Sequence, residues 1–340
     1  MPDNSPLTPK DVLLSGKRVR FFTNGTGPAL LLLHSAWGDA EMSWSPVWRG
    51  LSESFTVIAP DLPGFGASEP FDAPTLAANA RIMKELLVAL KINAAIVAGN
   101  SFGAAVAIEF ASSFPGRTLC VVLVNGGYLP LLPGFLRSLI SLPIMEKRFR
   151  TFMRNFNYSD KAFAKAFPNP GKLPPLFLDR IRRNEEKQSR IVFDTFMRQT
   201  KSQMPPPVPT AMIWGSGDRL VTMRQAGIIR KWLGNPDFVP IDGAGHMPQV
   251  ERPSEFVEAM KKIGQMRKNF QIIREECKKG QVSVEELEQG NRRRRVCESR
   301  LAIAFRSMKE LGLSGTEIAR QVGVNTSSVN RALAGLDKSA

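Results

Sequence analysis

Three residues whose types together permit nucleophilic catalysis stand in separate turns of the chain. Ser101 is the centre of Gly-Asn-Ser-Phe-Gly, Asp218 ends Trp-Gly-Ser-Gly-Asp, and His246 lies within Gly-Ala-Gly-His-Met-Pro. A serine hydroxyl becomes a strong nucleophile only when a base takes its proton, and a carboxylate can hold a histidine base in the required tautomer. These residue types predict acyl transfer in which Ser101 attacks, His246 is the base and Asp218 orients it.

The segments around Ser101 predict a sharp turn from a strand to a helix. The apolar run 94–98 precedes the turn, and the helix-like run 104–110 follows it. Small residues on either side of Ser101 permit the tight backbone that such a turn needs. The turn would expose the hydroxyl at the carboxyl edge of a sheet, with the first N–H groups of the helix directed at the same place.

The two other residues also follow apolar runs that resemble strands. Residues 210–214 precede Asp218, and residues 237–241 precede His246, so the chain order is Ser, Asp, His. The chain has two histidines, and the other one, His34, ends the apolar run 29–33. We expect His34 to brace its loop rather than to take part in chemistry.

With these residues in this order, the chain resembles the α/β-hydrolase fold family over roughly residues 18–264. The resemblance is carried by His-Ser-Ala-Trp-Gly at 34–38, by Asp-Leu-Pro-Gly-Phe-Gly-Ala-Ser at 61–68, and by the three turns described above. It implies an oxyanion hole formed by the backbone N–H groups of Ala36 and Phe102. The Asn-Ser-Phe-Gly sequence and the Pro-Gln after His246 are similar to capped esterases and to carbon–carbon bond hydrolases of the meta-cleavage type.

The alternation of elements predicts an α/β fold with a mostly parallel sheet and helices on both faces. Strand-like runs at 56–59, 94–98 and 119–124 are separated by helical patterns, of which 76–90 is one. The segment from Leu13 to His34 reads as a hairpin-like stretch turned by Asn-Gly-Thr-Gly at 24–27, leading into the first buried strand. We expect residues 1–127 and 206–264 to form this core.

Residues 128–205 are expected to form a helical cap inserted into the core. Strand signals stop there, and basic residues alternate with six phenylalanines: Phe135, Phe149, Phe152, Phe156, Phe163 and Phe167. Aromatic residues at helical spacing either pack the cap against the core or line an apolar pocket. The second reading implies a substrate with an apolar acyl or aromatic group.

Residues 265–340 are expected to form a separate basic, helical domain. Ser314 and Glu317 fit a capping box, Gly323 permits a turn, and apolar positions fall on one face of two short helices. This spacing resembles helix-turn-helix domains, and the region is similar to the C-terminal part of some bacterial transposases and of the replication initiator family. The resemblance implies DNA as a partner through the following candidate residues: Thr326, Ser327, Ser328, Asn330, Arg331, Arg292, Arg293, Arg294 and Arg295.

Charge, cysteine content and the length of apolar runs bear on metal binding, cofactors, membrane spans and the cellular location. The net charge is +15, and the basic excess is concentrated in residues 131–205 and in the tail. The three cysteines, Cys120, Cys277 and Cys297, show no metal or redox spacing. No apolar run is long enough to span a membrane. We therefore expect a cytoplasmic protein without a metal or a cofactor.

Two functions fit these observations. The first is a serine hydrolase that acts on a small ester or a related carbonyl compound, with a DNA-binding tail. The second is a DNA-binding regulator whose hydrolase-like domain senses a ligand. Within the first, the residues leave ester, carbon–carbon bond, thioester and perhydrolase chemistry open, because all can use the same three groups.

Overall fold

The computed structural model describes residues 8–283, 286–287, 293–311, 313–321, 324, 326–327 and 329. The chain divides into two compact units, Met1–Lys261 and Lys262–Ala340. Within the described residues, no helix is long and apolar enough to cross a membrane.

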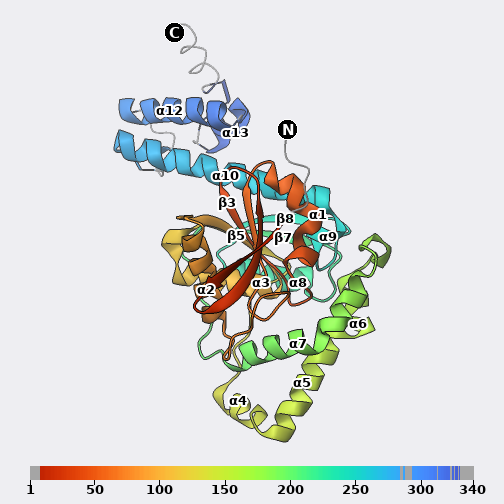
Figure 1. Ribbon diagram of the computed structural model, residues 1–340. Coiled ribbons are helices and arrows are strands. Elements are labelled where there is room, and N and C mark those ends of the chain that lie inside the picture. The colour runs from red at the N-terminus through yellow and green to blue at the C-terminus, as the bar shows by residue number, and fades with distance from the viewer. Residues whose placement is uncertain are drawn as a thin grey trace. The chain divides into compact units, whose positions relative to one another are not determined.

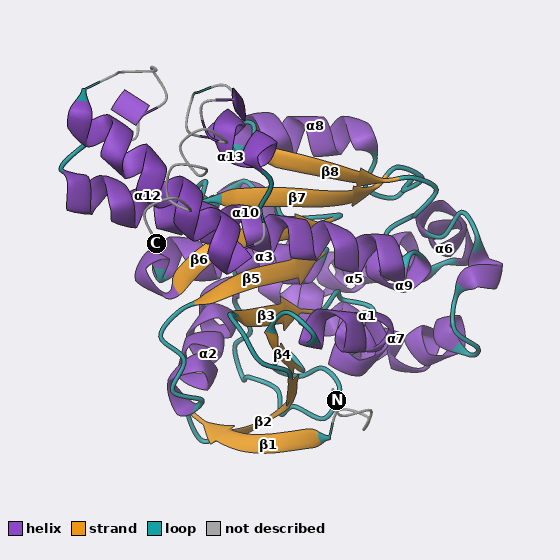
Figure 2. Ribbon diagram, turned by 90° about the horizontal axis from the view of Figure 1, so that it is seen from above, coloured by secondary structure: helices purple, strands orange, loops and turns teal. Residues whose placement is uncertain are grey.

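The first unit is built on an eight-stranded sheet with the order β1-β2-β4-β3-β5-β6-β7-β8 (Figure 2). Strands β3 to β8 pair in parallel with their neighbours in the sheet, whereas β2 pairs antiparallel with both β1 and β4. This pairing confirms the prediction of a mostly parallel sheet. The strands are β1 Pro9–Leu14, β2 Lys17–Asn24, β3 Ala29–Leu33, β4 Thr56–Pro60, β5 Ala95–Asn100, β6 Thr118–Val124, β7 Thr210–Gly215 and β8 Asp237–Ile241.

Helices cover both faces of the sheet, as the apolar strand β3 requires. Leu31 and Leu33 pack into the cluster formed with α2 and α3, while Leu30 and Leu32 alternate to the other face and are equally buried. Helix α1 packs against β3 and β4. The helices outside the insert are α1 Ala40–Ser52, α2 Leu76–Ala89, α3 Phe102–Ser113, α8 Met223–Trp232, α9 Pro248–Glu251 and α10 Pro253–Gly280, which continues into the second unit.

The hairpin near the N-terminus differs from the prediction. The turn between β1 and β2 lies at Ser15 and Gly16, whose φ angles are 47° and 75°, rather than at residues 24–27. Residues 25–28 instead connect β2 to β3, which are separated in the sheet by β4. Gly25 passes so close to the end of α1 that a Cβ there would lie 2.3 Å from the carbonyl oxygen of Phe55. The glycines at 24–27 therefore serve close packing of a connection, and the sequence pattern does not distinguish this from a hairpin turn.

Between β6 and β7 the described chain forms four α-helices that lie together on one side of the sheet (Figure 1). They are α4 Gly134–Ile140, α5 Pro143–Tyr158, α6 Asp160–Ala166 and α7 Phe177–Met197. Helices α5 and α7 pack through Phe149, whose ring centroid lies 6.2 Å from that of Phe193 and 6.5 Å from that of Phe196. We call these four helices the cap.

The second unit is helical where the structure describes it and has its own apolar core. Helix α12 spans Arg294–Leu311 and α13 spans Gly315–Gln321, while residues 326–327 and 329 are also helical. Two of the apolar positions expected on one helical face, Ile318 and Val329, are buried in this core, and Val324 packs against it. Of the positions singled out in the tail, Ser328, Asn330, Arg331, Arg292 and Gly323 lie outside the described residues.

Candidate active site

Ser101 stands at the apex of the turn between β5 and α3, in a strained backbone conformation. Its φ of 53° and ψ of −112° are rare for a residue with a side chain. The neighbouring backbone leaves no room for larger residues: a Cβ on Gly99 would lie 2.2 Å from the carbonyl oxygen of Gly103, and one on Gly103 would lie 2.3 Å from that of Leu33. The glycines therefore let α3 pack directly on the sheet and hold the serine hydroxyl above its edge.

Asp218 and His246 form a buried pair on two neighbouring loops. His246 Nδ1 lies 2.7 Å from Asp218 Oδ2, and both side chains are almost fully buried. The other carboxylate oxygen of Asp218 accepts hydrogen bonds from the backbone N–H groups of Leu220 and Val221, at 2.8 and 2.9 Å. Because Nδ1 is occupied by the carboxylate, Nε2 is the ring nitrogen left for a second partner.

Asn125 completes the surroundings of this pair, and the sequence analysis did not single it out. Its side-chain amide donates to Asp218 Oδ2 at 2.8 Å, and its side-chain oxygen accepts from the N–H of Gly215 at 3.0 Å. Asn125 therefore ties the carboxylate to the end of β7. A signal was present, since Asn-Gly-Gly at 125–127 directly follows an apolar strand, as the segments of Ser101 and Asp218 do.

A second buried amide connects the serine turn to the histidine loop. Asn100 Nδ2 donates to the carbonyl oxygens of Val124 and His246, both at 3.0 Å, and Gln249 donates to its side-chain oxygen at 3.2 Å. These bonds fix the two loops relative to each other. The sequence motifs contain both residues, as the Asn before Ser101 and the Gln of Pro-Gln, but the residues alone did not reveal that they bond to each other.

Hydrogen bonds connect the cap to two loops near Ser101, the loop that follows β3 and the loop that carries His246. Tyr158 donates its hydroxyl to the carbonyl of Ala36 at 3.1 Å, and Gln188 donates its side-chain amide to that of Gly38 at 3.0 Å. In the second loop, the N–H of His246 donates to the carbonyl of Ala166 at 2.8 Å. The position of the cap and the geometry of the site are therefore coupled.

His34 braces its loop, as predicted. Its Nδ1 bonds to the carbonyl oxygen of Ser35 at 2.7 Å, and its Nε2 accepts from the N–H of Leu62 at 2.9 Å. These partners require a neutral ring that donates through Nδ1. Complete burial lowers the pKa of His34, which favours the same neutral form. With both nitrogens bonded, the ring has no capacity left for proton transfer.

Two backbone N–H groups are available near Ser101. The N–H of Ala36 has no acceptor among the described residues. Phe102 is the first residue of α3, and the N–H groups of the first helical turn have no acceptor within the helix. Both residues line the same pocket as Ser101. Their expected role as donors to a negatively charged oxygen stays a prediction.

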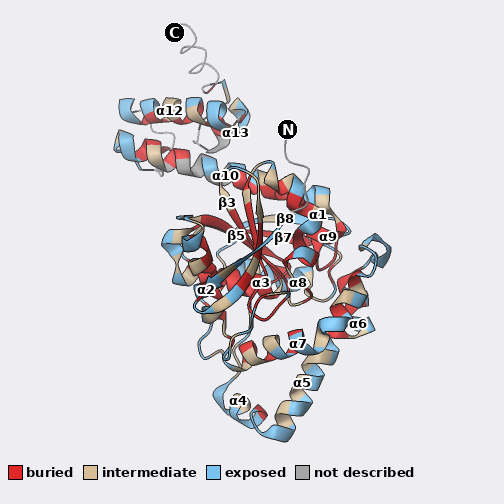
Figure 3. Cartoon of the chain, viewed as in Figure 1, coloured by how far each residue is buried: buried red, intermediate tan, exposed pale blue. Residues whose placement is uncertain are grey.

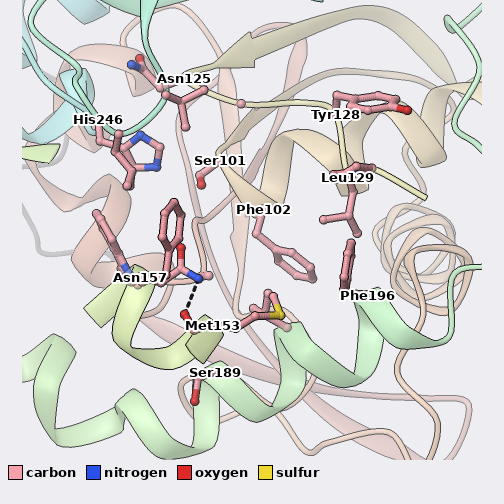
Figure 4. Close-up of a pocket in the computed structure, with 18 of the residues that line it drawn as sticks. Ser101, Phe102, Asn125, Tyr128, Leu129, Met153, Asn157, Ser189, Phe196 and His246 are labelled. Atoms are coloured by element: carbon pink, nitrogen blue, oxygen red, sulfur yellow. Dashed lines mark hydrogen bonds between the residues drawn. The ribbon is translucent and has the colours of Figure 1, made fainter. Parts of the chain in front are cut away.

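Ser101 and His246 lie next to each other at one end of a pocket of about 510 Å³ (Figure 4). Tyr128, Leu129 and Phe196 line its other end. Three of the six phenylalanines singled out in the cap, Phe149, Phe152 and Phe156, contribute to its wall. Apart from His246, the lining contains no ionisable side chain other than the tyrosines. The pocket therefore suits an uncharged, apolar group.

Metal ligation receives no support from the described residues. No group of three His, Cys, Asp or Glu side chains that could hold a metal ion occurs among them.

The candidate DNA-contacting residues that are described lie in the second unit, and all but one of them face solvent. Arg293, Arg294, Arg295 and Ser327 are exposed, and Thr326 is half-buried. Arg294 pairs with Glu298 at 2.8 Å within α12. Exposed pairs of this kind contribute little stability, so they compete weakly with an outside anion.

Glu251 is a buried carboxyl group beneath His246 that the sequence analysis missed. One of its oxygens accepts from the N–H groups of Gly245 and Met247, at 3.0 and 3.3 Å, while the other has no partner among the described residues. Burial raises the pKa of Glu251 to about 7. A lone Glu carries no sequence signal for such a position.

We predict that Glu251 makes the stability of the protein depend on pH. A carboxyl whose pKa is raised on folding binds a proton in the folded state between its unfolded value near 4.5 and about 7, so stability falls as pH rises through this range. Glu251→Gln should remove this decrease in the free energy of unfolding, which amounts to about 3 kcal/mol at most. Urea unfolding at pH 5 to 8 measures it, with exposed Glu258→Gln as the control. Parallel pH profiles of parent and Glu251→Gln would contradict the assignment.

Comparison with known proteins agrees with this architecture. The family model described as "Alpha/beta hydrolase family" matches residues 30–259. Lipase 1 of Psychrobacter immobilis is 27% identical over 262 residues, which cover 73% of this chain and 81% of that protein. A 2-hydroxymuconate semialdehyde hydrolase of a Pseudomonas species is 26% identical, covering 75% and 93%.

Solved structures show the same likeness. The crystal structure of a bacterial membrane phospholipase A superposes with a TM-score of 0.63 at 25% identity, covering 77% of this chain and 87% of that one. Because the family model spans most of the chain and includes strands β3 to β8, the serine turn and the histidine loop, this protein belongs to the alpha/beta hydrolase family.

Proposed function

We propose that this protein is a serine hydrolase that cleaves esters with an uncharged, apolar acyl group. The observation that carries the proposal is the buried Asp218–His246 contact of 2.7 Å beside Ser101, at the end of a pocket without fixed charge. The family membership and the lipase and phospholipase names of similar proteins support hydrolysis of this kind.

The mechanism follows from the placement of these groups. Ser101 Oγ attacks the ester carbonyl while His246 Nε2 takes its proton, and Asp218 stabilises the resulting imidazolium. The N–H groups of Ala36 and Phe102 stabilise the oxyanion of the tetrahedral intermediate. Collapse of the intermediate breaks the ester C–O bond, and His246 returns the proton to the leaving alcohol. Water activated by His246 then hydrolyses the acyl-enzyme and frees Ser101.

The lining of the pocket favours an ester over a substrate that bears a carboxylate, such as a muconate derivative. A carboxylate in this pocket would lose its hydration without meeting a cationic side chain, which is strongly unfavourable. An aliphatic or aromatic acyl group would instead contact Leu129, Phe149 and Phe196 and gain the free energy of apolar burial.

We predict that Ser101→Ala lowers the rate of hydrolysis of p-nitrophenyl butyrate by about 10³-fold or more, because the nucleophile is removed. Ser113→Ala, at the far end of the same helix, should keep the parent rate. Circular dichroism checks the fold of both variants, and labelling by a fluorophosphonate should be lost with Ser101 alone. Hydrolysis at the parent rate by Ser101→Ala would exclude this nucleophile.

A matched pair of esters tests the substrate class. We expect kcat/KM for p-nitrophenyl octanoate to exceed that for the p-nitrophenyl monoester of octanedioic acid by about 30-fold or more, since only the second places a carboxylate in the apolar pocket. The two esters have the same chain length and leaving group. Equal kcat/KM values for the two esters would show that the pocket tolerates charge and would favour carbon–carbon bond hydrolysis.

We also propose that residues 262–340 bind DNA. They form a compact unit with its own core, in which Ile318, Ala319 and Val329 are buried at the positions that a helix-turn-helix requires. Exposed Arg295 lies near the start of α12, where it can neutralise a phosphate. In the alternative function, this unit makes the protein a regulator and the pocket only senses a ligand; an intact parent chain without turnover on any ester would favour it.

We predict that the full chain retards a DNA duplex in a mobility-shift assay and that binding weakens steeply as salt rises, because phosphate contacts release counterions. Arg295→Glu should weaken binding by about fivefold, through loss of one contact and added repulsion. Arg148→Glu, which makes the same change of charge on the cap, should leave it unchanged. Failure to bind at low salt, or equal effects of the two substitutions, would refute a specific DNA surface on the tail.

A further inference from the structure

The outer end of the cap exposes four large apolar side chains where a water-soluble surface would carry polar ones. The exposed fractions are 78% for Phe135, 46% for Leu139, 53% for Leu142 and 72% for Ile144. Figure 3 shows that much of α4 and α5 is exposed. We call these four residues the cap tip. Exposed apolar residues that gather in one place commonly mark a surface that contacts another apolar phase.

Helix α5 connects the cap tip to the mouth of the pocket. Phe135 and Leu139 are four residues apart on α4, so they share a face, and Leu142 and Ile144 lie at the junction with α5. Along α5, Phe152 and Phe156 lie eight and twelve residues beyond Ile144, and exposed Arg148 stands between Ile144 and Phe152. These two phenylalanines are exposed by 60% and 56% and also line the pocket. The pocket therefore meets solvent beside Phe152 and Phe156, on the same helix that carries Ile144 of the cap tip.

Cationic side chains lie among these exposed apolar residues. Helices α4 and α5 carry five basic residues and one acidic residue. Lys147 and Arg148 are exposed and have no acidic partner among the described residues, whereas Arg150 and Arg154 pair with Glu146 and Glu186. Half-buried Arg137 bonds to the carbonyl oxygen of Gln199. The surface thus combines apolar side chains with two exposed cations, Lys147 and Arg148, that no acidic side chain among the described residues neutralises.

We propose that the cap docks on an anionic lipid surface through the cap tip, Lys147 and Arg148. Apolar side chains of an interfacial segment insert at the boundary between headgroups and acyl chains, while flanking cations attract anionic headgroups. A second copy of this chain is a poorer occupant, because pairing two such surfaces would bring their cations together. Docking would place the mouth of the pocket against the lipid, from which an apolar ester could enter without crossing water.

The first test measures binding of the full chain to vesicles by co-sedimentation. The vesicles consist of ether-linked phosphatidylcholine and phosphatidylglycerol in a two-to-one ratio, so that hydrolysis cannot change them. Ile144→Asp should weaken binding by roughly tenfold, because a charge replaces an inserted side chain. Ile228→Asp is the matched control, since Ile228 is 64% exposed on α8 and does not line the pocket. It should bind as the parent does.

A second comparison separates the cap from the basic tail. Arg148→Glu should weaken binding to these vesicles by about fivefold, and Arg295→Glu should not. Vesicles of phosphatidylcholine alone should bind the parent more weakly than the mixed vesicles do. Both Asp variants should retain the parent kcat on p-nitrophenyl butyrate, which shows that they are folded.

Three results would overturn the proposal. Equal binding by the parent and Ile144→Asp would exclude the cap tip, and loss of binding only with Arg295→Glu would assign the vesicle contact to the tail. A dimer of the parent in sedimentation velocity that Ile144→Asp dissociates would show that a second copy covers the cap tip. Because the readout is binding to lipids that cannot be hydrolysed, it is independent of whether Ser101 is the nucleophile.

Discussion

The hydrogen bond between Asp218 and His246 imposes the main physical constraint on this structure. A buried carboxylate is strongly unfavourable unless donors replace its lost hydration. Here the donors come from the chain around it: two backbone N–H groups from its own loop, the Asn125 amide and the imidazole. The ends of β6, β7 and β8 must therefore meet at one point, and the parallel order of the sheet brings them there.

The cap is part of this arrangement rather than an addition to it. Tyr158 and Gln188 bond to the loop that carries Ala36, and Ala166 bonds to the backbone of His246. The contacts of Trp37 with Phe163, Phe167 and His246 fill the space between the two loops with aromatic rings. Two phenylalanines singled out in the sequence thus pack the cap on the core, while three others line the pocket, so both readings of the aromatic pattern hold.

Local sequence revealed the parts of the site that depend on local geometry. Small residues around Ser101 predict the turn because only they fit the backbone there, and the position of His34 at the end of an apolar run predicts that it braces its loop. The Asn-Gly-Gly after β6 marks a strand end, but it does not show that Asn125 bonds to Asp218, 93 residues away. Glu251 bonds to nearby N–H groups, and its burial depends on how the rest of the fold covers it. The same limit applies at residues 24–27, where glycines needed for packing against α1 have the composition of a hairpin turn. In the tail, burial of Ile318 and Val329 follows from helical periodicity, whereas contact with an outside partner does not.

The bond from the His246 N–H to the Ala166 carbonyl has a consequence for how molecules enter and leave. If the cap swung away as a rigid body, it would pull on the backbone of the proposed base and disturb its alignment with Asp218. Substrate entry and product release through the mouth of the pocket are therefore easier by rotation of individual rings. Phe152 and Phe156, which are exposed and line the pocket, lie where such a gate would be. Ring rotation at an exposed site takes place within nanoseconds, far faster than hinge motion of a domain. Exchange of substrate and product need not limit turnover in such an enzyme.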